Sequence, residues 1–221
     1  MPMSRIEIQY NNREDWLAAR HLGIGASEAA AVMSVSPWMS RERLWEIKTG
    51  LSESVSKDSA AKKRGRELEG ALAELFFASH PEYKCWVRRP YTTVAQEERP
   101  WLFATLDSEM WISSRRTKKR PNRPPDAVLE IKTAEMYSAQ RWSEWDNQIP
   151  APYYMQVLHQ FLATGCSKVY LFAYLIGKEE SVVREYVFDR AEREDDLQVL
   201  LAEEIKFWAS VEGVRNNALQ G

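Results

Sequence analysis

The sequence predicts an α/β or α+β fold in which a central mixed β-sheet is flanked by helices. Apolar residues recur at helical spacing between residues 61 and 79, and runs of strand composition lie on both sides of a second helical pattern at residues 152–164. The chain has 221 residues, of which 44% are hydrophobic and 28% charged, so it can bury a full core. We therefore expect a single domain spanning residues 1–221, and not a disordered, collagen-like or coiled-coil chain.

The first fifty residues are predicted to be mostly helical. A short helix is expected over residues 15–20, and a second near Ser27, whose hydroxyl can cap the helix formers that follow it. After a turn, residues 40–49 are predicted to form a third helix, which Gly50 ends in a left-handed conformation.

The long helix predicted over residues 61–79 has the most regular pattern. Its apolar stripe consists of Leu68, Leu72, Leu75 and Phe76, and Pro81 stands just past its end. The remaining elements are strands at residues 85–94, 101–106, 110–113 and 128–131, a helix at 152–164, strands at 168–176 and 182–188, and an amphipathic helix at 191–211.

The cysteine content and the apolar runs limit the class of protein. Cys85 and Cys166 are the only cysteines, which excludes a disulfide framework, a four-cysteine zinc site and a cysteine-ligated iron–sulfur cluster. We expect both to be buried as small apolar side chains. No apolar run is long enough to cross a bilayer, and residues 1–10 lack the features of a signal peptide, so we expect a cytoplasmic protein with no membrane partner.

Charge is distributed unevenly, although the formal net charge is only −2. Residues 62–66 and 115–120 are basic, whereas residues 192–196 are mostly acidic. Such runs are ordinarily solvated surface. The second basic run lies in segment 113–125, which contains three prolines and is expected to be an exposed loop. Because local potential matters more than net charge, the total decides nothing about nucleic acid.

The segment Leu129-Glu130-Ile131-Lys132 carries the most informative chemistry. Side chains alternate across a strand, so Glu130 and Lys132 share one face while Leu129 and Ile131 point to the core. A carboxylate and an ammonium at the end of an apolar strand are costly to bury unless they are paired. An isolated Glu-x-Lys is most often a surface ion pair, and this segment alone leaves that interpretation open.

A second carboxylate is expected to converge on the first. Asp107 ends an apolar run, residues 104–106, which we place in the same sheet as Glu130. Hard cations such as Mg²⁺ or Mn²⁺ prefer oxygen ligands and keep positions open for water and phosphate. Lys132 could then orient and help deprotonate the attacking water in phosphodiester hydrolysis. Glu69, at the edge of the stripe on the long helix, is a third candidate, although such residues are more often solvated.

The sequence resembles the PD-(D/E)XK nucleases, in the branch of the phage lambda exonuclease and the YqaJ-like viral recombinases. The similarity extends from about Trp16 to Gly177 and consists of blocks in the family's order: Arg20 to Ser27, Ser36-Pro37-Trp38, Leu44 to Gly50, Gly65 to Glu69, Ala104 to Asp107, Leu129 to Thr133 and Tyr153 to Gln160. Two features depart from the family pattern. Leu106 replaces the signature's proline, and the loop between Asp107 and Glu130 is long and basic.

The resemblance implies a restriction-endonuclease-like core with a bound metal. The implied metal is Mg²⁺, or alternatively Mn²⁺, with two ions per active site. By position, its implied ligands are Glu69, Asp107, Glu130 and the main-chain carbonyl of Ile131. Lys132 is then the implied catalytic lysine, acting together with Glu130 and Asp107.

Three more residues match functional positions of the family. Gln156 matches a glutamine near the attacking water or the scissile phosphate, although it is otherwise an ordinary polar helix residue. Arg20 and Ser27 match the pocket for a 5′-phosphate end, where a guanidinium fork and a hydroxyl suit a phosphate.

The implied activity is 5′→3′ digestion of linear double-stranded DNA to 5′-mononucleotides. It leaves a 3′ single strand for phage-type homologous recombination with a single-strand annealing protein. The resemblance also implies a ring-shaped homo-oligomer, commonly a trimer, in the cytoplasm of a bacterium or a phage-infected host cell. The helices within residues 12–50 would form the DNA-end-binding part, residues 61–188 the nuclease core, and residues 191–211 the C-terminal helix.

Two further groups of residues could contact DNA. The loop residues that could bind phosphates are Arg115, Arg116, Lys118, Lys119 and Arg120. The tryptophans that could stack on unpaired bases, although most are expected in the core, are Trp38, Trp45, Trp101, Trp142 and Trp145.

Two alternative functions stay open at this point. An endonuclease or junction resolvase would use the same core, because metal ligands alone do not determine where a strand is cut. A DNA-binding recombination module that has lost catalysis is the other alternative. The four intact residues Glu69, Asp107, Glu130 and Lys132 count against it.

Overall fold

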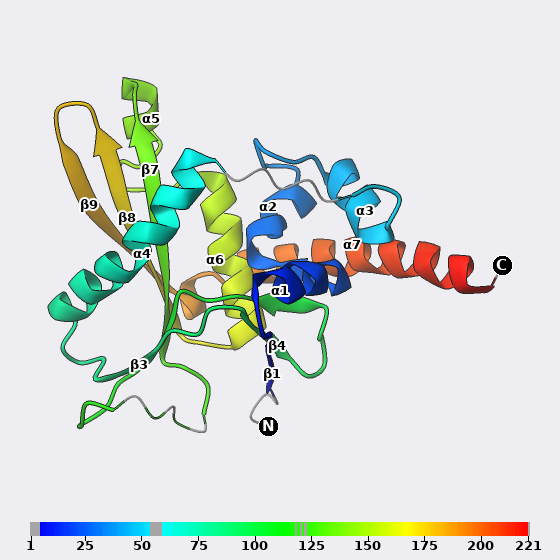
Figure 1. Cartoon of the computed structure of the whole chain (residues 1–221), viewed down its shortest axis with the longest axis horizontal. Helices are drawn as coiled ribbons and strands as arrows, with labels where there is room; N and C mark the ends of the chain where they lie inside the picture. The colour runs from blue at the N-terminus through cyan, green and yellow to red at the C-terminus, as the bar shows by residue number, and fades with distance from the viewer. Residues whose placement is uncertain (1–4, 54–58, 118, 120, 122, 221) are drawn as a thin grey trace.

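The computed structural model describes residues 5–53, 59–117, 119, 121 and 123–220, which form two mixed β-sheets with helices around them (Figure 1). The larger sheet has the order β3-β6-β7-β8-β9, with strands Cys85–Val87, Ser108–Trp111, Ala127–Met136, Lys168–Gly177 and Ser181–Asp189. The smaller sheet has the order β1-β4-β5-β2, with strands Arg5–Gln9, Thr92–Gln96, Leu102–Ala104 and Ile24–Gly25. The pairs β7–β8 and β2–β5 are parallel and the others antiparallel. This confirms the predicted mixed class.

Seven α-helices accompany the sheets in the described part of the chain: α1 Arg13–Ala19, α2 Ala29–Val32, α3 Arg41–Thr49, α4 Ala60–Ser79, α5 Ala139–Ser143, α6 Ala151–Thr164 and α7 Glu194–Gln220. Short 3₁₀ turns adjoin three of them, at Arg20–Leu22, Ala26–Glu28 and Arg190–Glu192. Figure 1 shows α7 running away from the larger sheet, with α3 close beside it. As predicted, Gly50 ends α3 in a left-handed conformation, with φ 83°.

Helices α4 and α6 cover opposite faces of the larger sheet. Leu72 and Phe76 of α4 belong to one buried cluster with Ile131 of β7. Val157 of α6 belongs to another cluster, which contains Val128 of the same strand. Each such side chain contributes about 1.5–3 kcal/mol when fully buried. Because side chains alternate along β7, the face that carries Val128 also carries Glu130 and Lys132 beneath α6.

Residues 85–94 do not form the single strand that was predicted. The chain leaves the larger sheet after Val87, turns through Tyr91 at φ 58°, and enters the smaller sheet as β4 at Thr92. Pro90 is the local signal for this break, because proline interrupts strand pairing. The split matters for the site, because it brings two neighbouring arginines to the junction of the sheets.

Other expectations have mixed outcomes. Both cysteines are buried and free, as predicted. Ser27 does not cap a helix but lies within a 3₁₀ turn, and Leu75 at the margin of the α4 stripe is 49% exposed. Strand β1 and helix α5 were not predicted. In the described residues, no helix combines the length and apolarity needed to cross a bilayer.

A buried ion pair fixes α6 to its surroundings. His159 Nδ1 lies 2.7 Å from Glu204 of α7, and Nε2 lies 2.9 Å from the carbonyl of Phe103 in β5. Both acceptors require an N–H, so the ring is an imidazolium. Burial lowers the pKa of His159, but the Glu204 carboxylate and the Phe103 carbonyl outweigh burial and raise the pKa above its ordinary value. The pair thus joins α6, α7 and the smaller sheet.

This pair predicts a pH-dependent stability. Because the folded pKa of His159 is raised, its contribution is complete below about pH 6.5, the ordinary histidine pKa, and is lost as the pH rises through the folded pKa. We expect His159→Gln to lower the free energy of unfolding by roughly 3 kcal/mol at pH 6, because Glu204 stays buried with a weaker partner. The difference from wild type should shrink toward pH 9.

Urea denaturation at several pH values measures both quantities. The control is His21→Gln, since the His21 ring faces the Ile47 carbonyl and not a carboxylate. A His159→Gln protein as stable as wild type at pH 6, or with the same decline in stability on raising the pH, would contradict the assignment.

Candidate active site

The candidate site forms where the two sheets part. Strand β6 pairs with β7 only along residues 127–129, so the edge of β7 beyond Leu129 is open to Asp107. The main-chain N–H of Ile131 donates to Asp107 Oδ2 at 2.7 Å. Since the N–H and C=O of one strand residue point to the same side, the Ile131 carbonyl also points toward this gap.

Asp107 reaches the site by a route that differs from the prediction. The apolar run before it ends as β5 in the smaller sheet, whereas β6 in the larger sheet begins just after it, at Ser108. The expectation that Asp107 ends a strand in the same sheet as Glu130 is therefore wrong. Asp107 approaches β7 because the chain crosses from one sheet to the other at this residue.

Glu130 lies at the centre of a buried hydrogen-bond network. Its side chain is only 4% exposed, which excludes the surface ion pair that the sequence left open. Oε1 accepts from Lys132 Nζ and, at 2.7 Å, from Gln156 Nε2, while Oε2 accepts from Gln160 Nε2. A buried carboxylate is tolerated only when its oxygens are satisfied in this way.

Lys132 stands between Glu130 and an aromatic ring. Burial lowers the pKa of Lys132, but the carboxylates of Glu130 and Asp107 outweigh burial and raise the pKa above its ordinary value. The Nζ atom also lies 5.4 Å from the ring centroid of Tyr153 in α6. The side chain is therefore held as an ammonium that can donate to water or phosphate.

Asp107 and Glu69 complete a group of three carboxylates. The pKa of Asp107 lies well above its ordinary value, first because of burial and then because of the charges of Glu130 and Glu69, which Lys132 only partly offsets. Glu69 on α4 pairs with Arg88, which follows β3. Crowded oxygen ligands whose charges repel one another suit a hard divalent cation, which would offset that repulsion.

As they stand, these carboxylates do not form a finished metal site. In the residues that the structure describes, no group of three His, Cys, Asp or Glu side chains is spaced to hold an ion. Glu69 is turned to Arg88, and both oxygens of Glu130 carry amide or ammonium donors. The donor types fit Mg²⁺ or Mn²⁺, and Glu69 would have to turn from its arginine to bind one.

The Arg20–Ser27 pair is already assembled. Arg20 Nη2 donates to Ser27 Oγ at 3.0 Å and lies 3.3 Å from Glu28. Lys48, buried with 1% of its side chain exposed, lies 2.8 Å from Glu28 and donates to the Arg20 carbonyl at 2.6 Å. Burial raises the pKa of Glu28, but Lys48 and Arg20 outweigh burial and keep it low. Arg20 and Lys48 thus share the single carboxylate of Glu28. The positive charge that Glu28 does not neutralise could bind an anion.

One cavity joins this pair to the carboxylates. It has a volume of about 590 Å³, within the usual range for ligand sites, and is lined by Arg20, Ser27, Glu69, Asp107, Glu130 and Gln156 among others. The arginines that line it are Arg13, Arg20, Arg66, Arg88 and Arg89. Five arginines and three carboxylates thus line the cavity, and Arg20 and Arg89 also pair with Glu28, Glu7 and Glu109 around it.

Several of these residues were not in the predicted site. Gln160 bonds to Glu130 one turn after Gln156, and the i, i+4 spacing of two glutamines in an apolar helix was the signal that could have found it. Arg13, Arg88 and Arg89 come from segments that only the split between β3 and β4 and the placement of α1 bring to the cavity.

The basic loop lies apart from this cavity. Arg115, Arg116 and Lys119 are exposed, whereas Lys118 and Arg120 lie outside the described residues. None of the three described residues lines the cavity, because the loop leaves β6 at its far end, after Trp111. Of the five tryptophans considered, Trp145 is in the core and Trp38 is 66% exposed.

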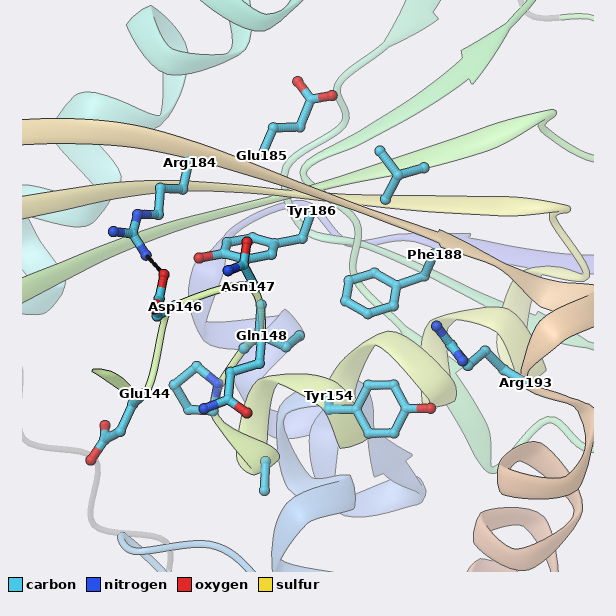
Figure 2. Close-up of a pocket in the computed structure, with 14 residues that line it drawn as sticks. Glu144, Asp146, Asn147, Gln148, Tyr154, Arg184, Glu185, Tyr186, Phe188 and Arg193 are labelled. Carbon is cyan, nitrogen blue, oxygen red and sulfur yellow. Dashed lines mark ion pairs between the residues drawn. The ribbon is translucent and has the colours of Figure 1, made fainter. Parts of the chain in front are cut away.

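A second, larger hollow lies on the other side of α6, between β9 and residues 144–151 (Figure 2). Figure 2 shows Arg184 and Asp146 facing each other there, with Tyr154 and Arg193 at the opposite end. The ion pair between Arg184 and Asp146 has a distance of 3.8 Å. Carboxylates, amides, arginines and aromatic rings line this hollow together. It contains none of the residues that converge on Glu130.

The comparison with protein families places this chain. Residues 15–167 match the YqaJ-like viral recombinase domain, and the chain belongs to that family. This confirms the resemblance found in the sequence. The uncharacterized protein YqaJ of Bacillus subtilis (strain 168) is 30% identical over an alignment of 215 residues, and the match covers 94% of this chain and 60% of that protein. The chain thus spans about three fifths of its relative's length.

Solved structures share the fold. An alkaline exonuclease (LHK-Exo) of Laribacter hongkongensis has a TM-score of 0.59 at 19% identity, covering 94% of this chain and 98% of that one. The same enzyme in complex with dAMP matches with a TM-score of 0.59 at 18% identity and the same coverage. A phage-related exonuclease of Haemophilus somnus 129PT has a TM-score of 0.51 at 12% identity, covering 87% and 96%.

Proposed function

We propose that this protein is a Mg²⁺-dependent exonuclease that digests linear double-stranded DNA from 5′ ends. The observation that carries the proposal is the single cavity shared by the carboxylates and the Arg20–Ser27 pair. A 5′-terminal phosphate bound by Arg20 and Ser27 would hold the first nucleotide beside the carboxylates. The bond that is cut would then be the phosphodiester bond after that first nucleotide. The products are 5′-mononucleotides and a 3′ single strand.

Each site residue then has a defined role. The metal would be Mg²⁺ or Mn²⁺, with two ions in the full mechanism. Its ligands would be Glu69, Asp107, Glu130 and the main-chain carbonyl of Ile131. A bound metal of this kind activates water and neutralises phosphate charge. Lys132 orients the attacking water or offsets charge on the phosphate. Gln156, bonded to Glu130 Oε1 at 2.7 Å, keeps that carboxylate aimed at the cavity.

The phosphate end of the substrate is recognised by charge and shape. Arg20 offers a planar guanidinium, and Ser27 offers a hydroxyl 3.0 Å from it. Lys48 and Glu28 position the pair, because Lys48 holds both the Arg20 carbonyl and the Glu28 carboxylate that flanks the guanidinium. An alkaline exonuclease with the same fold has been solved with dAMP, a mononucleotide, which agrees with a product of this kind.

We base the proposed biological setting on the family. Membership in the viral recombinase family supports a role in phage-type homologous recombination, in which the 3′ strand passes to a single-strand annealing protein. A homotrimeric ring around the DNA, in the cytoplasm of a bacterium or a phage-infected cell, belongs to the same proposal. Residues 12–50 would then form the DNA-end-binding part of a single exonuclease domain.

The decisive assay compares three DNA substrates in Mg²⁺. We expect rapid digestion of 5′-phosphorylated linear duplex, slower digestion of 5′-hydroxyl linear duplex, and intact covalently closed circles. The reason is that only a 5′-phosphate end can bind to both Arg20 and Ser27. Release of 5′-mononucleotides measured over time gives the three rates.

Lys132→Ala is the control, and we expect it to lose digestion while retaining DNA binding. Cutting of closed circles as fast as linear duplexes would instead identify an endonuclease. Binding without digestion by wild type would identify an inactive recombination module. Digestion by Lys132→Ala at the wild-type rate would overturn the role of the lysine.

The basic loop is proposed to contact DNA outside the cavity. Arg115, Arg116 and Lys119 are exposed, and with Lys118 and Arg120 they make a run of cations that phosphates could bind. Each phosphate that the protein no longer neutralises lowers the slope of log affinity against log salt by about 0.9. We expect neutralising Arg115, Arg116 and Lys119 together to flatten that slope in DNA-binding titrations, and an unchanged slope would contradict the proposed role of the loop.

A further inference from the structure

Trp38 is a solvent-exposed aromatic residue close to the candidate active site. It is 66% exposed, whereas Trp111 and Trp145 are at most 1% exposed. Aromatic side chains ordinarily bury most of their large apolar surface. Trp38 therefore keeps most of its surface accessible in the described part of the chain.

The ring is held in place on one side. Its centroid lies 5.9 Å from that of Tyr153, and the Tyr153 ring in turn packs at 5.3 Å on Trp145. The main-chain N–H groups of Trp38 and Met39 both donate to Ser36 Oγ, at 3.2 and 3.3 Å, which fixes the turn that carries the ring. Because the Trp38 ring is already held by Tyr153, it loses little conformational freedom when a second flat group stacks on it.

Tyr153 connects this ring to the catalytic group. The same tyrosine ring that supports Trp38 lies 5.4 Å from Lys132 Nζ, and Lys132 is bonded to Glu130. Trp38 thus stands one side chain away from the lysine.

We propose that Trp38 is a stacking platform for an unpaired base of the DNA substrate next to Lys132. A nucleobase fits because every base has a flat π face, and stacking on an exposed aromatic ring is tolerant of sequence. The exposed residues around Trp38 are mixed in character, because Val35 and Pro37 are exposed together with Ser34 and Ser40. We infer a base as the occupant because the Tyr153 ring that contacts Trp38 also lies beside Lys132. This inference rests on the proposed function, because it requires DNA at the site.

The test measures binding of a short single strand and a blunt duplex in EDTA, where metal-dependent digestion cannot proceed. Stacking of one base contributes about 1–3 kcal/mol, which corresponds to roughly 5- to 150-fold in affinity. We expect Trp38→Ala to weaken binding of the single strand by that factor and binding of the blunt duplex by less. Trp38→Phe should retain most of the affinity, since it keeps an aromatic face.

The fluorescent base 2-aminopurine reports stacking directly. Placed at successive positions of the strand, it should be quenched at one position by wild type and Trp38→Phe but not by Trp38→Ala. Val199→Ala is the matched control, because Val199 is 57% exposed on α7 and its loss removes exposed apolar surface elsewhere. Thermal unfolding of each variant checks that the fold is unchanged.

The outcomes separate the platform from the proposed function. If wild type binds and digests DNA but Trp38→Ala binds and quenches as wild type does, the platform is wrong and the nuclease assignment stands. If Trp38→Ala weakens the blunt duplex as much as the single strand, the occupant is not an unpaired base and the proposal also fails. If wild type neither binds nor digests DNA, both proposals fall together.

Discussion

The buried carboxylate of Glu130 is the constraint on which the rest of the site depends. An ionised carboxylate inside a protein costs several kcal/mol unless its oxygens are bonded. Strand β7 supplies Lys132, and helix α6 supplies Gln156 and Gln160, one turn apart on the side that faces the sheet. Helix α6 is therefore polar at two positions where an ordinary buried helix would be apolar. If α6 moved away from β7, the Glu130 carboxylate would lose both of its glutamine donors.

Helix α6 is also the part that joins the two sheets. His159, between the two glutamines in sequence, faces away from Glu130 and bonds to the smaller sheet and to α7. The junction of the sheets is where Asp107, Arg88 and Arg89 enter the cavity. The junction that forms the cavity therefore brings acidic and basic side chains together. Burial, and then the charges of Glu130 and Glu69, raise the pKa of Asp107. These residues cost local stability, and a bound cation would offset that cost.

Much of this could be predicted from the sequence where local pattern decides the structure. Helix α4, the alternation along β7 and the cap at Gly50 follow from spacing and residue type. Helices α3 and α4 lie close to the predicted bounds, whereas β7 continues to Met136, five residues beyond the strand that was predicted. What could not be predicted depends on pairing between distant segments. The split between β3 and β4 and the open edge beside Ile131 arise from which strand finds which neighbour. Ser27 shows the same limit, because its hydroxyl suits a helix cap locally but accepts from Arg20 in the fold.

The central claim is that the carboxylates around Glu130 form a divalent metal site. Calorimetric titration of Mn²⁺ into wild type, Glu130→Gln and Glu135→Gln tests it without requiring catalysis. Glu135 is the matched control, because it lies on the same strand but pairs at the surface with Arg64, with half of its side chain exposed. We predict that wild type and Glu135→Gln bind Mn²⁺ alike and that Glu130→Gln loses at least about tenfold in affinity, the smallest loss typical even of outer partners of a metal site. Equal binding by Glu130→Gln, or no binding by wild type, would contradict the claim.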